Sequence, residues 1–496
     1  MAKLRSNMIY QTVYNVLAVC VPLVTSPYLS RVLGAEGLGI YSYNYSIVSY
    51  FMLFALLGVT TYGMRTVSQS KDKTERSKNF FSIYAFQLIS SFASLVVYLL
   101  FVIIFIKDDI SRTVSYIHVL YLVAECININ WFFFGLEKYK SIVIRNIIIK
   151  LITVASIFAF VRKSEDIAVY VFILAFCNVL SNLVIWLQLR PCIERVKITW
   201  ADIKMHIKPN LLLFIPALAA SVYHIMDKTM LGMFSDNANS GYYYNADKLL
   251  NIPLVVVTGC SSVFMTRTCT LYKDNDMENA KKTQNESVFF GMCVICAVAF
   301  GICAVAAEFV PWFFGAGYEP CITLVKYFAI IVICKTLSTH TRSVFLIPEK
   351  NDRSYANAIL IGALINLVAS YILIAYLKLG ALGATLAILI AEFTVVITQI
   401  MMMKNKESKA FCIKGIGYSM LYVLAGAVMM LVVQIVPLNI ASLTLKMLVK
   451  IAIGACVYVL ECIILWRVKP SLMPDMIGET IQQIKNKLLK NKTKAS

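Results

Sequence analysis

The chain has 496 residues, of which 59% are hydrophobic and only 15% are charged. Soluble domains are about 45 to 50% apolar and about 25% charged, so this composition excludes a soluble domain and predicts a membrane protein. The 46 Lys and Arg residues outnumber the 27 Asp and Glu residues, which leaves a net charge of +19. Because these cations lie between apolar runs, the excess indicates orientation in a membrane and disfavours a nucleic-acid partner.

Fourteen apolar windows follow one another along the chain, each long enough to cross a membrane as a helix. The first six cover residues 8–30, 40–63, 80–106, 114–136, 141–161 and 167–189. Six more cover residues 210–234, 241–266, 286–310, 320–347, 355–377 and 381–403, and the last two cover 417–436 and 443–466. The runs are continuous and not ten-residue alternations, which predicts helices and no barrel. The expected fold class is an all-α polytopic membrane protein with about 14 transmembrane helices.

The windows predict four regions along the chain. They are an N-lobe at residues 1–200, a C-lobe at 201–410, two further helices at 411–470 and a basic amphipathic cytoplasmic tail at 471–496. The tail has apolar residues at helical spacing, namely Met476, Ile477, Ile481, Ile484, Leu488 and Leu489. A short helix on the inner leaflet is one interpretation, and a frayed, solvated tail is the other.

The distribution of Lys and Arg predicts the orientation of the chain. If the N-terminus is cytoplasmic, the inner side collects 33 of the 46 cations and the outer side seven, and the remainder lie within the windows. This bias alternates correctly across every loop, so it also supports the number of spans. Both termini are predicted to be cytoplasmic, in a multi-pass membrane protein.

Two motifs recur along the sequence. The end of the first window, with residues 30–44, and the end of the seventh, with residues 227–245, each place a cation before Leu-Gly and then Gly, aromatic residues and Asn. Residues 134–138 and 345–350 both begin with Phe and end with Glu-Lys. We expect a duplicated six-helix unit and hence two lobes related by a pseudo-twofold axis along the membrane normal; chance similarity among apolar sequences is the alternative.

Several segments together resemble a known family. They are Pro27 to Ser42, Leu57 to Arg65, Trp131 to Lys138, Gly241 to Lys248 and Phe314 to Tyr318. These segments are similar to those of Wzx-type polysaccharide flippases, members of the multidrug/oligosaccharidyl-lipid/polysaccharide exporter superfamily. The resemblance covers essentially the whole chain, including the fourteen-span layout.

The resemblance implies the activity, the substrate and the partners. It implies a flippase that carries an undecaprenyl-diphosphate-linked oligosaccharide to the outer face of the bacterial cytoplasmic membrane, by alternating access through a cationic central cavity. The lipid-linked cargo and the bilayer are the expected partners, with a polysaccharide polymerase or glycosyltransferases as further candidates. No cofactor is expected.

Charged residues inside the apolar windows are the candidate site residues, because a charge at a helix centre costs at least about 2.5 to 3.5 kcal/mol. Lys150, near the middle of the fifth window, is the leading cavity cation, with Arg145 and Asn146 on the same helix. Pairing of Lys150 with Glu125 of the fourth window is the structural alternative. Glu125 is also a candidate coupling acid.

The seventh and eighth windows carry two acid–base pairs, Asp227 with Lys228 and Asp247 with Lys248. An antiparallel hairpin would hold the two pairs at matching depth. They are interpreted either as cavity groups, with the lysines facing the substrate, or as an ion-pair latch between the helices without a substrate role.

Arg31 and Arg65 close the first and second windows. Each is interpreted either as an interfacial anchor or, from the resemblance, as a cleft cation that meets the diphosphate.

Two other functions were weighed. A cation-coupled drug or small-molecule exporter of the same superfamily would need a decisive acid in the N-terminal half, where Glu125 alone lies well inside a window. An enzyme is disfavoured because the longest loops are basic connectors and the four His residues have no metal-ligand spacing. The 14 Cys residues lie mostly in apolar runs and predict no metal site.

Overall fold

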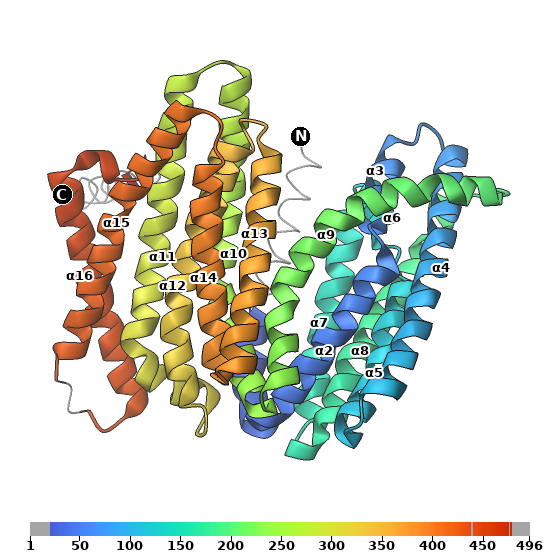
Figure 1. Cartoon of the computed structure of the whole chain (residues 1–496), viewed down its shortest axis with the longest axis horizontal. Helices are drawn as coiled ribbons and strands as arrows, with labels where there is room; N and C mark the ends of the chain where they lie inside the picture. The colour runs from blue at the N-terminus through green and yellow to red at the C-terminus, as the bar shows by residue number, and fades with distance from the viewer. Residues whose placement is uncertain (1–19, 438–439, 476, 479–496) are drawn as a thin grey trace, which may run out of the picture. The chain divides into compact units, whose positions relative to one another are not determined.

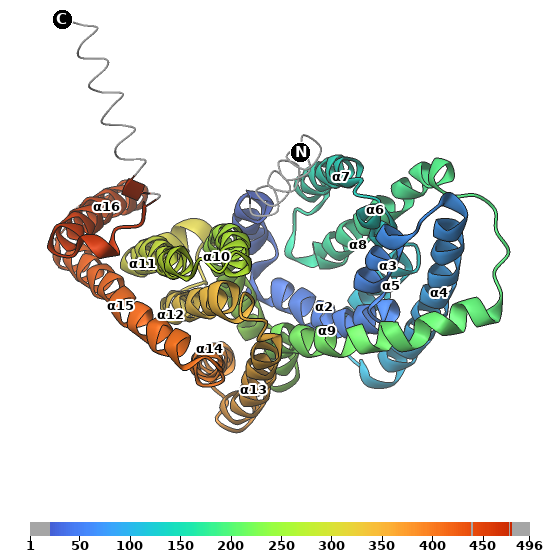
Figure 2. The same cartoon turned by 90° about the horizontal axis from the view of Figure 1, so that it is seen from above.

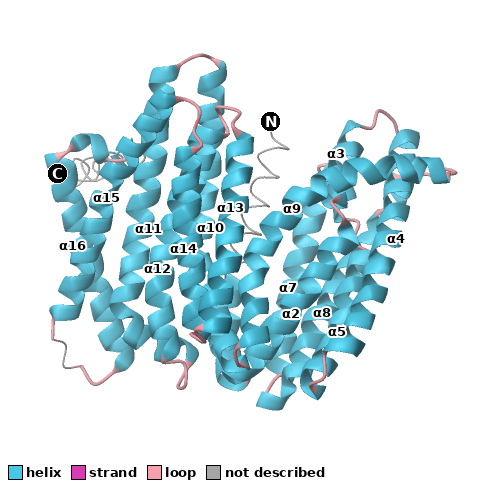
Figure 3. Cartoon of the chain, viewed as in Figure 1, coloured by secondary structure: helices cyan, strands magenta, loops and turns pink. Residues whose placement is uncertain are grey.

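The computed structural model describes residues 20–437, 440–475 and 477–478. Every regular element in these residues is helical, and they contain no strand (Figure 3). The prediction of an all-α membrane protein is confirmed. Most of the predicted amphipathic tail lies outside the described residues.

Twelve helical segments are long and apolar enough to cross a membrane. They are Gly34–Gln69, Lys73–Phe105, Asp109–Gly135, Tyr139–Phe160, Ser164–Gln188, Asn237–Lys273, Met277–Phe314, Pro320–Leu346, Asp352–Tyr376, Gly380–Met401, Lys406–Ile435 and Leu443–Val468. These twelve match windows two to six and eight to fourteen of the sequence. The seventh window falls on another helix, Trp200–Phe234, and the first lies partly outside the described residues. The count of fourteen stays a prediction.

The chain forms two compact units. The first contains residues 1–245 and 370–384, and the second contains residues 246–369 and 385–496. Helix α9 (Trp200–Phe234) packs along α2, α3 and α4 of the first unit. The predicted lobes, which change over at residue 200, stay a prediction.

The first unit is a bundle built around α2 (Gly34–Leu56) and α5 (Asp109–Cys126). Helix α2 packs against α4 (Lys73–Phe105), α5 and α9, and α5 also packs against α8 (Ile167–Val184), which contacts α7 (Tyr139–Phe160). Two short helices, α3 (Val59–Gln69) and α6 (Asn130–Gly135), contact each other at one end of the bundle (Figure 1). Their contact brings residues of α3, α6 and α7 together.

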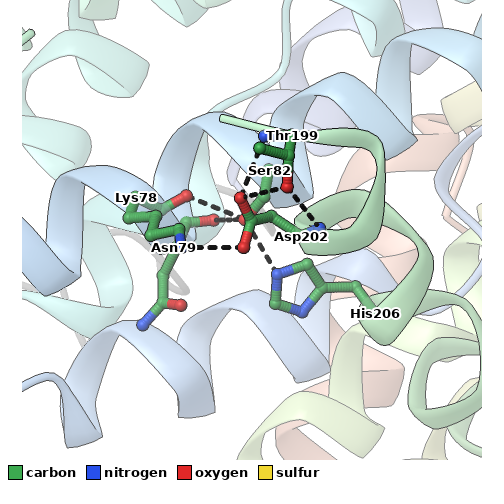
Figure 4. A network of polar contacts seen from close by, with 6 residues as sticks. All are labelled: Lys78, Asn79, Ser82, Thr199, Asp202 and His206. Carbon is green, nitrogen blue, oxygen red and sulfur yellow. Dashed lines mark hydrogen bonds and ion pairs between the residues drawn. The ribbon is translucent and has the colours of Figure 1, made fainter. Parts of the chain in front are cut away.

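Helix α9 runs along the bundle (Figure 2), and polar side chains at its first turns fasten it there (Figure 4). Thr199 and Asp202 form a reciprocal capping box, and Lys78 of α4 lies 2.8 Å from the Asp202 carboxylate. The bond from Lys78 lowers the pKa of Asp202 to about 2. One turn further, the buried ring of His206 bonds the Tyr62 and Ser82 hydroxyls, both at 2.8 Å. These contacts fix where α9 begins on the bundle.

The two copies of the first repeated motif lie against each other within the first unit. Gly39 of α2 meets the backbone of Asn237, the first residue of α10 (Asn237–Lys273), so closely that a Cβ on Gly39 would overlap the Asn237 carbonyl. A Cβ on Gly241 of α10 would likewise overlap the carbonyl of Ala35. Main chain therefore packs on main chain at this crossing, which only glycine permits.

The second unit is arranged around α11 (Met277–Phe314), the most buried of its long helices together with α12 (Pro320–His340) and α14 (Gly380–Met401). Helix α11 contacts α12, α15 (Lys406–Ile435) and α16 (Leu443–Val468), and the last two contact each other. Helix α13 (Asp352–Ser370) follows a π-helical turn at Thr341–Leu346.

Both copies of the second repeated motif contain a Schellman turn. Glu137 and Lys350 both have a φ of 55°, and the amide of the following residue bonds the carbonyl five positions back, at 3.0 Å from Lys138 to Phe133 and at 2.9 Å from Asn351 to Leu346. The turns fall on different motif positions, because the residue with positive φ is the Glu of the first copy and the Lys of the second. The duplication stays a prediction.

Candidate functional site

A buried chain of side-chain hydrogen bonds links Arg145 of α7 to Glu125 of α5. The Arg145 guanidinium donates to Asn130 Oδ1 at 2.9 Å, Asn130 Nδ2 donates to Asn128 Oδ1 at 2.7 Å, and Asn128 Nδ2 donates to Glu125 Oε2 at 2.8 Å. Arg145 is 6% exposed and Glu125 7%. Arginine can only donate and a carboxylate can only accept, so both amides are polarised in one direction. We call these four residues the amide chain.

The amide chain exists because the helix breaks between α5 and α6. The break leaves backbone carbonyls without helical partners inside an apolar bundle, where an unpaired carbonyl is costly. Gln87 of α4 donates to the carbonyls of Glu125 and Asn128 at 2.7 and 2.8 Å. Gln87 is in turn held by the indole of Trp131, at 2.9 Å. The buried side chains of Gln87 and Trp131 thus support the break that carries Asn128 and Asn130, which are themselves partly buried.

A pocket of about 280 Å³ lies beside the amide chain. It is lined by residues of α3, the α5–α6 break, α6 and α7, namely Thr60, Asn128, Asn130, Trp131, Phe134, Ile142, Val143 and Asn146. All of them belong to the first unit. The lining combines amides and a hydroxyl with apolar and aromatic side chains.

Lys150 lies on the same face of α7 as this pocket. It follows the lining residues Val143 and Asn146 at helical spacing, one turn beyond Asn146. Lys150 is partly buried. The leading candidate cation and the amide pocket are therefore neighbours on one helix. Whether Lys150 faces a substrate cavity stays a prediction.

Asp227 and Lys228 of α9 lie in polar and aromatic surroundings. The Asp227 carboxylate is 1% exposed and accepts bonds from the Tyr243 hydroxyl at 3.1 Å and the Ser370 hydroxyl at 3.0 Å. The Lys228 ammonium lies 5.9 Å from the centre of the Tyr244 ring, at the long end of cation–π range. Asp227 thus ties α9 to two other segments of the first unit.

The other predicted residues are not members of the amide chain. Arg31 is exposed and donates to the carbonyl of Pro27 at 3.1 Å, and Arg65 is exposed on α3. Asp247 and Lys248 lie on the part of α10 that belongs to the second unit, where Asn251 bonds Asp247 at 3.1 Å. The proposed latch between the two acid–base pairs and the substrate roles of these residues stay predictions.

The second unit carries its own buried ion pairs. Glu308 of α11 accepts bonds from Lys450 at 2.6 Å and Lys446 at 3.2 Å, both on α16. Lys335 of α12 lies 3.8 Å from Glu392 of α14. These pairs join α11 to α16 and α12 to α14.

Arg145, Glu125 and Asn146 stand out in the sequence as polar groups of the candidate site, whereas Asn128, Asn130 and Gln87 were not predicted. Their signal is that amides within apolar windows also need buried partners. Amides carry no formal charge, so they are less conspicuous in an apolar window than Lys, Arg, Asp or Glu.

Comparisons with known proteins agree with this architecture. The family model described as polysaccharide biosynthesis protein matches residues 4–265. A protein of Escherichia coli (strain K12) named "Putative O-antigen transporter" is 21% identical over 410 residues, which covers 82% of this chain and 97% of that protein. A protein of Shigella dysenteriae with the same name is 21% identical over 389 residues, covering 76% and 94%.

Two solved structures share the fold. The lipid II flippase MurJ, in an inward closed conformation, has a TM-score of 0.73 at 14% identity and covers 93% of this chain and 99% of its own. An inward-facing multidrug resistance MATE family transporter of the MOP superfamily has a TM-score of 0.60 at 14% identity, covering 82% and 96%. At such identities the likeness shows the fold alone.

Proposed function

The chain belongs to the polysaccharide biosynthesis protein family, and from this we propose that it is a flippase for lipid-linked oligosaccharides. The cargo would be an undecaprenyl-diphosphate-linked oligosaccharide, moved from the inner to the outer face of the bacterial cytoplasmic membrane for surface polysaccharide assembly. The names of its relatives and the flippase fold of its structural neighbour support this proposal. The protein would act as a transporter and not as an enzyme.

The central physical problem for such a protein is the diphosphate. A group with about two negative charges loses its hydration in a low-dielectric region, and a fixed cation offsets part of that cost. Lys150 is the residue best suited to this task, because it is a cation in the middle of a membrane helix beside a polar pocket. This placement is the observation that carries the proposal.

The remaining cations would take supporting roles. Arg31, Arg65, Lys228 and Lys248 would line the route of the headgroup, and Arg145 would orient the amides beside it. The two lobes would expose the cargo to each side of the membrane in turn.

A cation-coupled drug exporter is the alternative function. It requires an acid in the N-terminal half that can release its partners and bind a proton or sodium. Glu125 already accepts a bond from Asn128 and is joined through two amides to Arg145. Because Glu125 already has these hydrogen-bond partners, we favour the proposal of an anionic cargo over that of a cation-coupled exporter.

Lys150→Gln tests the proposal in a strain whose surface glycan depends on this protein. We expect surface glycan to fall to near the level of a strain without the protein, because the diphosphate loses its buried cation. The measurement is the amount of surface glycan at equal protein abundance, with Lys150→Arg expected to restore part of the export.

The matched control is Lys140→Gln, since Lys140 is exposed near the start of the same helix and its charge change is identical. Normal glycan in Lys150→Gln cells, or an equal loss with Lys140→Gln, would remove Lys150 from the mechanism.

A further inference from the structure

The pocket beside the amide chain is a binding site without an assigned ligand. We infer that it holds one neutral sugar ring of the cargo, the class of ligand being a hydroxyl-rich pyranose. This inference rests on the proposed function and adds a recognition site for the glycan to it.

The size of the pocket sets the size of the ligand. Pockets for drug-sized molecules range from about 300 to 1,000 Å³. At about 280 Å³ this pocket is at the small end of that scale, which suits a single ring of the oligosaccharide and not the whole repeat.

The lining favours a neutral ligand over a charged one. No Lys, Arg, Asp or Glu residue lines the pocket. The two charged residues of the amide chain, Arg145 and Glu125, are both buried and lie at its opposite ends, and neither lines the pocket. A phosphate in this pocket would lose hydration without meeting a cation directly.

The polar atoms of the lining match hydroxyl groups. Asn146 Oδ1 accepts bonds from the Arg145 guanidinium at 2.7 and 3.2 Å and from the Ser181 hydroxyl at 3.3 Å. Its oxygen is thereby fixed toward Arg145, which orients the amide NH₂ group of this pocket residue the opposite way as a donor. The exposed Thr60 hydroxyl, across the pocket on α3, can both donate and accept. A sugar hydroxyl needs both kinds of partner.

The apolar part of the lining matches the other face of a sugar ring. Phe134 and Trp131 of α6 and Ile142 and Val143 of α7 supply carbon surface. A pyranose presents C–H groups on its faces and hydroxyls around its edge, so it fits a wall that is apolar on one side and polar on the other.

The position of the pocket also fits the chemistry of the cargo. Lys150 follows Asn146 by one helical turn, so their Cβ atoms are about 5 to 6 Å apart. In the lipid-linked cargo the diphosphate is bonded directly to the first sugar. A sugar in the pocket thus places the diphosphate within reach of Lys150.

The test uses the full-length protein in nanodiscs and saturation-transfer difference NMR. The probe is the oligosaccharide repeat of the dependent strain's surface glycan, released from its lipid by mild acid. We expect saturation on the protons of one sugar ring, and about tenfold weaker binding with Asn146→Leu, as for the loss of one good hydrogen bond. Asn178→Leu is the matched control, because Asn178 bonds Asn182 at 3.3 Å but does not line the pocket.

Thr60→Val provides a second variant in case Asn146→Leu does not fold, because Thr60 is exposed and its removal leaves the amide chain intact. We expect Thr60→Val to weaken binding as well. Wild-type binding by both pocket variants, or displacement of the sugar by inorganic diphosphate, would overturn the inference.

The two proposals can fail separately. If Lys150→Gln stops export but the pocket variants bind sugar like the wild type, the sugar site is wrong and the flippase stands. If the pocket variants lose binding but Lys150→Gln exports normally, the proposed role of Lys150 in moving the diphosphate fails and the sugar site stands.

Discussion

Arg145 and Glu125 are two buried charges that do not touch. A direct buried ion pair must recover the hydration lost by both ions through a single contact. In this protein two asparagine amides lie between the charges and each is polarised by both of them. Hydrogen bonds aligned in this way strengthen one another, so the chain holds α5, α6 and α7 together.

Removing both ends of the amide chain should cost less stability than the sum of the costs of removing each end alone. We expect Arg145→Leu to destabilise the protein by about 3 to 5 kcal/mol, because it leaves Glu125 buried with no compensating cation. The double variant Arg145→Leu with Glu125→Leu should be less harmful than the sum of the two single variants. Unfolding in mixed detergent and SDS measures this, and strictly additive effects would argue against coupling through the amides.

The sequence identified the ends of the amide chain but not its middle. Charges within apolar windows are conspicuous, which is why Arg145, Glu125 and Lys150 could be named. The asparagines between them could not be named from the sequence, because their pairings are decided by helix packing. Asn130, for example, bonds Asn182, 52 positions away. The structure joins Glu125 through two amides to Arg145, the neighbour of Asn146. The alternative pairing of Glu125 with Lys150 stays a prediction.

At the scale of helices, the crossing of α2 and α10 is the closest approach between the repeated motifs. Gly39 and Gly241 each allow the main chain of one motif to reach the main chain of the other. The recurrence of glycine was visible in the sequence. The contact between the copies was not, since a repeat predicts similar structure in each copy and says nothing of where the copies meet.

An added methyl group should disrupt this crossing. We expect Gly39→Ala and Gly241→Ala each to destabilise the protein by about 1 to 3 kcal/mol or more, the usual cost of overpacking. Gly259→Ala on the same α10 is the matched control, because a Cβ there meets nothing within 4 Å, and alanine is favoured over glycine in a helix by about 1 kcal/mol. Thermal unfolding of the purified variants tests this, and equal melting temperatures for Gly241→Ala and Gly259→Ala would contradict it.

At the scale of the whole molecule, the apolar windows predicted the helices but not their full lengths. Helix α11 begins nine residues before its window, which starts at residue 286, because polar residues continue the helix beyond the apolar stretch. Hydropathy marks the part of a helix that suits lipid, whereas capping residues such as Asp276, which accepts from Asn279, set its end. The predicted lobe boundary at residue 200 stays a prediction.

The charge bias of the loops predicts a fixed topology. We expect a fluorescent protein fused at the C-terminus to fluoresce, since it would fold in the cytoplasm, and alkaline phosphatase inserted between α15 and α16 to be active outside. Both reporters would be measured in cells at equal expression. An active phosphatase at the C-terminus would mean an odd number of spans and would reverse the inner and outer sides assigned to the last helices.

The glycine contacts of α2 also determine which second-site substitutions can compensate for a mutation there. A methyl group on Gly232 would overlap the ring of Tyr43, a side chain that a second substitution can shorten. The atoms that a methyl group on Gly39 would meet all belong to the backbone of Asn237, and no substitution removes a carbonyl. A second substitution at Tyr43 can therefore compensate for a substitution at Gly232. A substitution at Gly39 overlaps backbone atoms, so its steric overlap is removed locally only by restoring the glycine.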